Sequence, residues 1–228
     1  MNNNKFKVSF IGYYKNAYNF KDSSCILPIS VGQRYHEGEM FEAVINIINN
    51  NFKTCHIVVC DSLQRHTLEL FDHKTNQDIH AYANQLGEAW INRSMPVITT
   101  LEIPYEITRW DDWLLKNDYK EQRIKVDKLY DVNNKFRLAV QNSVHMFLDR
   151  CQKRMGDEFD YDKFLPSSIE YFKEECAVMP LWAKKRINFE IYNGKRPDAL
   201  VVAHQHFVPK DLLVWLNLRF RTKSQNNA

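Results

Sequence analysis

The stretch Cys25-Ile-Leu-Pro-Ile-Ser30-Val-Gly-Gln33 decides the fold, because an apolar run ends abruptly at a hydroxyl residue and a glycine turn. Residues 25–29 have the short apolar composition of a buried strand bounded by turn residues. An amphipathic run over residues 38–50 follows the turn. In an open α/β sheet, ligands bind in the crevice beyond the carboxyl ends of the strands. The pattern therefore indicates either a nucleophilic Ser30 facing such a crevice, or a serine that caps the following helix.

Strand-like and helix-length segments alternate along the chain. The predicted strands are residues 6–11, 25–29, 55–60, 96–103, 188–192 and 199–203, and the predicted helices are residues 38–50, 76–92, 167–179 and 211–219, with further helix from 62 and a broken helical region over 106–154. Strands separated by helix-length segments are joined by parallel crossovers. The sequence therefore predicts one α/β domain over residues 1–228. We expect a doubly wound, mostly parallel sheet with flanking helices, and mobile polar ends over about residues 1–4 and 222–228.

Composition excludes several classes of protein. The chain has 228 residues, of which 44% are hydrophobic, enough for a full core. Its formal net charge of +3 confines any polyanion site to a local patch. The five cysteines are scattered, without a C-x-x-C pair, which argues against a disulfide framework or a zinc site. Residues 1–5 lack the apolar core of a signal peptide and no apolar stretch reaches the roughly 18 residues of a membrane span, so we expect neither. We expect a cytoplasmic protein that contacts no membrane and is a monomer.

The common cofactor motifs are absent. No phosphate-binding glycine motif follows a strand, and H-E-x-x-H does not occur. His204-x-His206 could place two imidazoles on one face of a predicted strand, but zinc usually needs three or four protein ligands. Structural histidines are therefore the favoured interpretation. We expect no metal and no cofactor.

A second candidate feature is a predicted helix start at Pro166-Ser167-Ser168-Ile169-Glu170, where Ser167 and Glu170 have the spacing of a capping box. On that helix Tyr171 and Glu175 are four residues apart and share a face. A phenol and a carboxylate aimed into a cleft could hold an ammonium group and accept its proton. An exposed tyrosine beside a solvated glutamate is the alternative.

A third candidate, Tyr192, ends a predicted strand just as Ser30 does. Both side chains could face one crevice at the carboxyl edge of the sheet. The alternative is an aromatic strand terminus that packs on a neighbouring element.

These three features, in this order, resemble the tRNA-dependent cyclodipeptide synthases. The resemblance extends from about Ile26 to Tyr192 and includes the pattern Ser30-x-x-Gln33-x-Tyr35. It implies a Rossmann-like catalytic domain similar to those of class I tyrosyl- and tryptophanyl-tRNA synthetases, without their ATP-binding signatures. One branch of the family has Asn three residues after the serine and His after the strand-terminal tyrosine. With Gln33 and Asn193 at these positions, the chain lies closer to the other branch, although it lacks that branch's usual proline.

The resemblance also implies the chemistry. Two aminoacyl-tRNAs would be the substrates, an aminoacyl-Ser30 and then a dipeptidyl-Ser30 enzyme would form, and a cyclic dipeptide would be released without metal or ATP. Tyr171 and Glu175 would hold the α-amino group, with Glu175 as proton acceptor, and Tyr192 would assist catalysis near Ser30. The implied substrate-binding residues are Ile26, Pro28, Val58 and Cys60, which would line the pocket for the first side chain, together with Gln33 and Asn193.

A tRNA substrate needs a basic surface near the crevice. We favour the two clusters that flank the predicted Tyr192 strand, namely Lys184, Lys185 and Arg186 before it and Lys195 and Arg196 after it. The alternative docking face is a helix carrying Lys116, Lys120 and Arg123.

Two other classes of function stay open from the sequence. One is a Rossmann-like module that binds aminoacyl-tRNA or another RNA without chemistry. The other is a serine hydrolase in which Ser30 pairs with a histidine such as His36 or His204. The hydrolase is less favoured because the chain has no G-x-S-x-G elbow.

Overall fold

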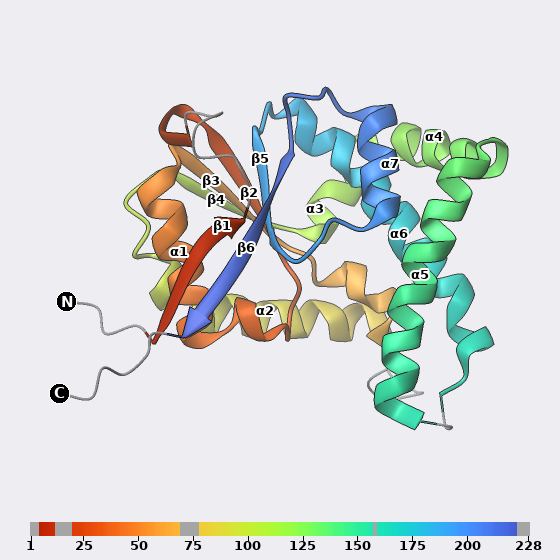
Figure 1. Ribbon diagram of the computed structural model, residues 1–228, viewed down its shortest axis with the longest axis horizontal. Helices are drawn as coiled ribbons and strands as arrows, with labels where there is room; N and C mark the ends of the chain where they lie inside the picture. The colour runs from red at the N-terminus through yellow and green to blue at the C-terminus, as the bar shows by residue number, and fades with distance from the viewer. Residues whose placement is uncertain (1–4, 12–19, 69–77, 157–158, 223–228) are drawn as a thin grey trace.

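The computed structural model describes residues 5–11, 20–68, 78–156 and 159–222, and these form a layered α/β structure (Figure 1). The strands are β1 (Phe6–Ile11), β2 (Ser24–Ile29), β3 (Thr54–Val59), β4 (Tyr105–Arg109), β5 (Phe189–Asn193) and β6 (Val214–Thr222). They lie in the order β1-β6-β5-β2-β3-β4, with β1 antiparallel to β6 and every other neighbouring pair parallel. This confirms the predicted, mostly parallel sheet. The predicted mobile ends fall outside the described residues, except Thr222, which ends β6.

Helices cover both faces of the sheet, as expected of a doubly wound fold (Figure 1). One face packs against α1 (Gly38–Asn51) and α2 (Ile79–Ile98). The other carries α3 (Trp110–Leu114), α4 (Tyr119–Val132), α5 (Asn134–Met155), α6 (Tyr161–Lys184) and α7 (Asp198–Phe207). The short helical turns η2 (Phe20–Asp22), η3 (Arg34–His36) and η4 (Ser62–His66) complete the described elements.

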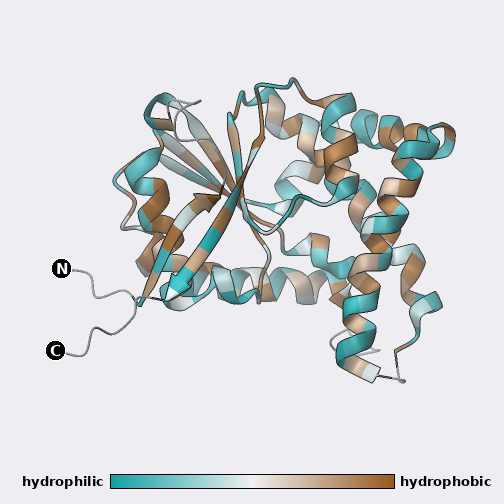
Figure 2. Ribbon diagram, viewed as in Figure 1, coloured by the Kyte–Doolittle hydropathy of each residue, from teal (hydrophilic) through white to brown (hydrophobic). Residues whose placement is uncertain are grey.

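Strand β2 is buried on both of its faces, which explains its continuous apolar sequence. Leu27 and Ile29 join the core beneath α1 and α2, whereas Ile26 joins the core beneath α6 and α7. Figure 2 shows apolar residues on the sides of the helices that face the sheet and polar residues on their outer surfaces.

A proline limits the pairing of β2 with β5. β2 pairs with β3 up to Ile29, but with β5 only at Cys25 and Ile26. Alternate residues of a parallel strand bond to opposite neighbours. Because the Ile29 carbonyl bonds to β3 through the Cys60 N–H, Pro28 is turned toward β5. Proline has no N–H to donate. The β2–β5 ladder therefore stops before the carboxyl ends, at the point where the chain switches from one half of the sheet to the other.

Residues 96–103, predicted as a strand, are not one. Pro96 lies inside the last turn of α2, and the strand begins later, at Tyr105. A proline inside a helix removes one main-chain hydrogen bond. Helix α2 ends two residues after Pro96, where the Thr99 hydroxyl bonds the Met95 carbonyl at 3.0 Å. The predicted helical region over 106–154 accordingly starts as β4 and continues as α3, α4 and α5. The prediction for 76–92 corresponds to α2, and its first two residues lie outside the described ranges.

Two predictions near the end of the chain have the wrong element type: residues 199–203, predicted as a strand, are helical, and most of residues 211–219, predicted as a helix, form a strand. Residues 198–207 form α7, whose buried positions, Ala199, Leu200, Val202 and Ala203, have helical spacing. Residues 214–222 form β6, in which Leu216 and Leu218 alternate with more exposed neighbours. Both segments are short and apolar, so their composition did not distinguish helix from strand.

The predicted helix over 167–179 lies within a longer one, α6. Asp160 caps α6 by accepting a hydrogen bond from the Lys163 N–H at 3.0 Å. Ser167 lies inside the helix, where its hydroxyl bonds the Phe164 carbonyl at 3.1 Å. The predicted Ser167–Glu170 capping box is therefore wrong. Pro166 misled the prediction because proline is also common in the first turn of a helix.

A buried carboxylate fastens β3 to β4 and α2. Asp61 follows β3 and is fully buried; its carboxylate accepts hydrogen bonds from Arg109 Nε at 2.7 Å and the Ser62 N–H at 2.8 Å. Burial raises the pKa of Asp61, and the bonds from Ser62 and Arg109 oppose that rise. Gly87 of α2 packs directly on this group, where a Cβ atom would overlap the Asp61 carboxylate.

We predict that Gly87→Ala destabilises the protein by about 1–3 kcal/mol, the cost typical of overpacking. Alanine is the better helix former by about 1 kcal/mol, so helix propensity alone predicts the opposite sign. Urea unfolding measures the difference, with Gln85→Ala on the exposed face of α2 as the control. An unchanged or raised free energy of unfolding for Gly87→Ala would contradict the assigned packing.

Candidate active site

Ser30 lies directly after β2, at the start of a tight turn. The Ser30 carbonyl accepts a hydrogen bond from the Gln33 N–H at 3.2 Å, and Gly32 adopts a φ of 82° within the turn. Glycine takes positive φ without steric cost, which allows the chain to reverse there. The turn leaves the Ser30 side chain half-buried at the carboxyl edge of the sheet.

Three hydroxyl groups form a chain across the gap between β2 and β5. Ser30 Oγ lies 2.7 Å from the Tyr192 hydroxyl, and the Tyr35 hydroxyl donates to Tyr192 at 2.8 Å. Burial raises the pKa of Tyr35 above its usual range and the pKa of Tyr192 well above it. Both phenols therefore remain protonated near neutral pH and act through hydrogen bonds. The structure thus brings Ser30 and Tyr192 together, as their strand-terminal positions predict.

Tyr171 and Glu175 lie on α6 and face the same region. Burial raises the pKa of Tyr171 well above its usual range, and electrostatic interactions with Glu175, Tyr192 and Tyr35 add to the rise. Burial also raises the pKa of Glu175 to about 8, with a further contribution from Glu190. Near neutral pH, this carboxyl group therefore keeps its proton in most molecules until a cation approaches.

A buried ion pair beside Glu175 was not predicted from the sequence. Arg196 Nη2 lies 2.6 Å from Glu190 Oε2, with both side chains less than a tenth exposed. The Arg196 guanidinium lies over the Trp215 ring at 5.4 Å, and that ring packs against Tyr192 at 5.6 Å between centroids. Because Arg196 binds Glu190 directly, its charge only partly offsets the rise in the pKa of Glu175.

Two sequence signals could have indicated this pair. Glu190 interrupts the otherwise apolar segment Phe189-Glu-Ile191, and it is two residues before Tyr192. Residues two apart on a strand share a face, so Glu190 had to point the same way as Tyr192.

The four residues predicted to line the first side-chain pocket lie on one side of the sheet. Pro28 is buried, and the other three, Ile26, Val58 and Cys60, all belong to the core that includes α6. The alternation of β2 and β3 turns them toward the helix that carries Tyr171 and Glu175.

Gln33 and Asn193 do not lie with the four pocket residues on the side of the sheet that faces α6. Gln33 is exposed, and its main-chain N–H closes the Ser30 turn. Asn193 lines an open hollow of about 440 Å³ together with Met40 of α1 and with residues of β1 and β6. It therefore borders the site from the α1 side of β5 rather than the α6 side.

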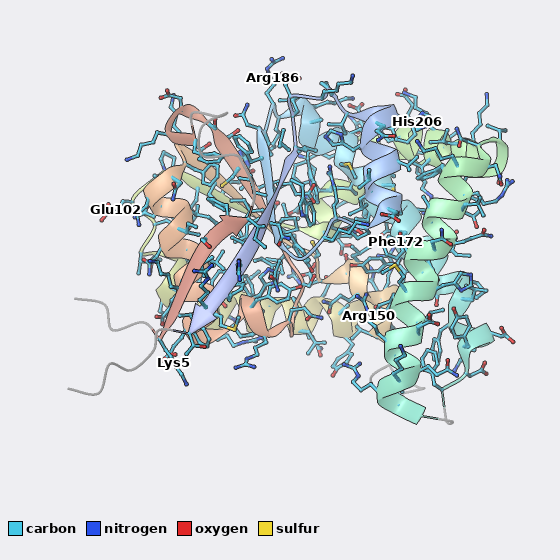
Figure 3. All side chains as sticks on the ribbon, viewed as in Figure 1. Lys5, Glu102, Arg150, Phe172, Arg186 and His206 are labelled. Atoms are coloured by element: carbon cyan, nitrogen blue, oxygen red, sulfur yellow. The ribbon has the colours of Figure 1, made fainter. Side chains whose placement is uncertain are left out.

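The positions predicted for tRNA docking need correction. Lys184, Lys185 and Arg186 precede β5, so they lie at the amino end of the parallel strands, whereas Ser30 and Tyr192 lie at the carboxyl end. The Arg186 carbonyl lies 3.5 Å from Ser24 Oγ at the start of β2, and the six-residue rise from Ser24 to Ser30 is about 20 Å for a strand. Figure 3 shows Arg186 at the end of the sheet opposite to Arg150 of α5. The cluster at 184–186 does not border the crevice.

Of the other basic residues predicted to contact tRNA, one is buried and one is exposed. Arg196 is buried in the ion pair with Glu190 and is not a surface contact. Lys195 is exposed on the loop after Tyr192, 3.1 Å from Asp198. On the alternative face, Arg123 is held by Asp127 of the same helix, α4, and by Glu170 of α6.

A second buried carboxylate, Glu174, is structural. It accepts hydrogen bonds from Trp110 Nε1 at 2.8 Å and from Arg65, and His66 Nε2 lies 3.3 Å away. These contacts tie α6 to α3 and η4. Adjacent residues of a helix point about 100° apart, so the side chains of Glu174 and Glu175 point to different sides of α6.

The histidines do not form a hydrolase dyad with Ser30. His36 Nδ1 lies 3.0 Å from the Ser30 main-chain nitrogen, so this histidine binds the backbone of Ser30. His204 lies in α7 rather than a strand, and its Nε2 atom bonds the Leu212 carbonyl at 2.8 Å. Neither ring is bonded to the Ser30 hydroxyl.

Within the described ranges, no group of three or more His, Cys, Asp or Glu side chains is arranged to hold a metal ion. None of the described helices is long and apolar enough to cross a membrane.

Comparison with solved structures identifies the family. A cyclodipeptide synthase from Fluoribacter dumoffii is 35% identical, with a TM-score of 0.89, and the match covers 96% of this chain and 100% of that one. The chain therefore belongs to the cyclodipeptide synthases, which confirms the resemblance inferred from Ser30, Tyr171, Glu175 and Tyr192.

More distant matches show the fold. A cyclodipeptide synthase from Candidatus Glomeribacter gigasporarum, solved bound to Phe-tRNAPhe, is 16% identical with a TM-score of 0.76, covering 94% of this chain and 95% of that one. Tyrosyl-tRNA synthetase from Archaeoglobus fulgidus is 10% identical with a TM-score of 0.52, covering 86% and 55%. The fold is thus the Rossmann-like fold of class I synthetases. Models of protein families gave no match, and neither did curated protein sequences.

We predict that Glu190→Gln shifts the pH dependence of cyclic dipeptide formation toward acid. In the free enzyme, Glu175 ionises as pH rises through about 8, because burial and then the Glu190 charge raise its pKa. Removing the Glu190 charge, and releasing Arg196 to act on Glu175, both lower that pKa. A rate that requires ionised Glu175 should therefore reach its plateau at lower pH, and kcat/KM reports this free-enzyme ionisation.

The pH profile of kcat/KM measures the shift. The α-amino group of the substrate ionises in the same way in assays of both enzymes, so it does not contribute to the difference. Glu106→Gln, at the amino end of β4, is the control. A rising limb that stays in place, or moves toward alkali, in Glu190→Gln would contradict the assignment. Circular dichroism at each pH excludes unfolding as the cause.

Proposed function

We propose that this enzyme joins the aminoacyl groups of two aminoacyl-tRNAs into a cyclic dipeptide, with Ser30 as the covalent nucleophile. The observation that carries the proposal is the 2.7 Å contact between Ser30 Oγ and the Tyr192 hydroxyl, beside Glu175, in a member of the cyclodipeptide synthases. The substrate ester is already activated, so the reaction needs neither ATP nor a metal.

In the first step Ser30 Oγ attacks the ester carbonyl of the first aminoacyl-tRNA. The new Oγ–C bond replaces the bond from that carbon to the tRNA 3′-terminal ribose, and the departing ribose oxygen takes the proton that Ser30 gives up. Tyr192 holds Ser30 Oγ by a hydrogen bond and is itself held by Tyr35. This orientation is the contribution that a fixed hydroxyl chain makes to a nucleophile.

In the second step the α-amino group of aminoacyl-Ser30 attacks the ester of a second aminoacyl-tRNA. A peptide bond forms, the second tRNA leaves, and the dipeptide remains on Ser30. The amino group of the dipeptide then closes on the Ser30 ester and frees the hydroxyl. Tyr171 and Glu175 hold the reacting amine, and ionised Glu175 accepts its proton.

The pocket for the first side chain is formed by Ile26, Pro28, Val58 and Cys60. Their burial on the side of the sheet that faces α6 supports this assignment. Burial, followed by the charge of Glu175, raises the pKa of Cys60 well above its usual range, so the thiol is neutral. We expect an apolar first side chain, because an unpaired polar group in such a pocket carries a desolvation cost. Gln33 and Asn193 border the site at its outer edge.

The cytoplasm is the compartment that we propose. All five cysteines are free thiols, and Cys25 and Cys55 are opposite each other on adjacent strands without a disulfide bond. Free thiols persist in a reducing compartment.

The tRNA acceptor end enters past α5 and the loop after β5. Arg150 is exposed on α5, and its charge partly offsets the rise that burial causes in the pKa of Tyr35, so it lies near the hydroxyl chain. Figure 3 shows Arg150 on the side of α5 toward the sheet. Lys195 is exposed on the other side of Tyr192. These two cations replace the cluster at 184–186 as the proposed phosphate contacts.

Ser30→Ala should abolish cyclic dipeptide formation and leave the fold intact, because a small side chain fits the turn. Mass spectrometry of the medium after expression in a bacterium detects the product. Ser24→Ala, at the opposite end of the same strand, is the matched control and should retain activity. Product formation by Ser30→Ala at the control level would remove Ser30 from the role of nucleophile.

Arg150→Glu should weaken aminoacyl-tRNA binding and reduce the slope of log affinity against log salt by about 0.7–0.9 per lost phosphate contact. Lys184→Glu makes the same charge change at the far end of the sheet and should alter neither quantity. Filter binding at several salt concentrations measures both. If only Lys184→Glu weakens binding, the docking face lies at the amino edge and our proposal is wrong.

A further inference from the structure

His36 is a buried histidine that the steps above do not use. It ends η3, is 0% exposed, and packs edge-on against Tyr192 at 5.6 Å between ring centroids. Its main chain is fixed as well, since its carbonyl accepts from Trp90 Nε1 at 2.9 Å and its N–H donates to the Gln33 carbonyl at 2.8 Å. The ring is therefore held firmly beside the hydroxyl chain.

The contacts around Ser30 favour one assignment of the proton on the His36 ring. The Ser30 carbonyl, 3.2 Å from His36 Nδ1, already accepts from the Gln33 N–H. The Ser30 N–H instead lies 3.0 Å from His36 Nδ1 and needs an acceptor. A neutral imidazole has one donor and one acceptor nitrogen. We assign Nδ1 as the acceptor for the Ser30 N–H, which places the proton on Nε2, a buried nitrogen without a hydrogen-bond partner among the described residues.

The surroundings keep this ring neutral. Burial lowers the pKa of His36 to about 4, a shift that the Ser30 carbonyl, 3.2 Å from Nδ1, reduces only in part. The groups around it are the Tyr35 and Tyr192 rings and the Ser30 backbone. A ring that is neutral across the working range, with its acceptor nitrogen occupied, cannot take the Ser30 proton.

We propose that His36 is a positioning residue that fixes the main chain of the nucleophile. His36 Nδ1 holds the Ser30 N–H, the Gln33 N–H holds the Ser30 carbonyl, and Tyr192 holds Ser30 Oγ. The nucleophile is thus restrained at three points, and His36 provides the one that sets the direction in which the strand leaves the sheet. This inference rests on the proposed role of Ser30.

Two substitutions separate the acceptor atom from the ring. Asparagine can place its Oδ1 atom where Nδ1 lies, so His36→Asn keeps an acceptor and loses the ring. His36→Phe keeps the ring and loses the acceptor. His204→Phe is the matched control, because it also removes a histidine–backbone contact, in α7.

The readout is the rate at which acid-quenched enzyme accumulates aminoacyl-Ser30 in a single turnover. We expect His36→Phe to lower this rate by about 100-fold at saturating aminoacyl-tRNA, the scale associated with a misplacement of about 1 Å, with little change in KM. His36→Asn should acylate at least tenfold faster than His36→Phe. The acylation rate of the wild type should show no ionisation near pH 6.5, the usual pKa of histidine.

Any of three results would overturn the inference. His36→Phe could acylate at the wild-type rate, or His36→Asn and His36→Phe could lose the same share of that rate. The wild-type acylation rate could also show an ionisation near pH 6.5, the usual pKa of histidine, that disappears in His36→Phe. If His36→Phe does not fold, as judged by circular dichroism, His36→Gln replaces it, because its oxygen extends beyond the Nδ1 position. Absence of aminoacyl-Ser30 in the active wild type would instead refute the proposed function.

Discussion

The missing hydrogen bond at Pro28 is the constraint on which the site depends. It stops the β2–β5 ladder at Ile26, in the middle of an otherwise continuous sheet. Beyond that point, Ser30 and Tyr192 meet through their hydroxyl groups instead of through the backbone. Proline is rare in a central strand because it breaks the ladder. Here the break lies at the switch point of a doubly wound sheet, where ligands of this architecture bind.

The charges around the site leave one carboxyl group, that of Glu175, able to change its protonation state near neutral pH. Asp61 and Glu174 are bound directly by arginines, which fix the elements on which the site is built. Glu190 takes the direct contact with Arg196, so Glu175 receives only part of that positive charge. Desolvation raises the pKa of Glu175 to about 8, and an arriving ammonium group would lower it. A group that ionises when its substrate binds suits proton transfer from an amine.

The sequence predicted correctly those elements whose residue pattern fits only one kind of structure. The apolar strand before Ser30 and the i,i+4 relation of Tyr171 and Glu175 were both found in the structure. Residues 199–203 and 211–219 failed because short apolar segments satisfy helix and strand periodicity alike. Arg196 was mistaken for a surface cation because its burial depends on Glu190 and Trp215, which approach it only in the folded chain.

The proposed mechanism requires that the first covalent species be an ester on Ser30, and peptide mapping of acid-quenched enzyme tests this directly. The enzyme is mixed with a single aminoacyl-tRNA, quenched within the first turnover, digested and examined by mass spectrometry. The predicted result is one aminoacyl group, confined to the peptide that contains Ser30. An aminoacyl group on a different residue, or none at all while cyclic dipeptide is being formed, would contradict the role of Ser30 as nucleophile.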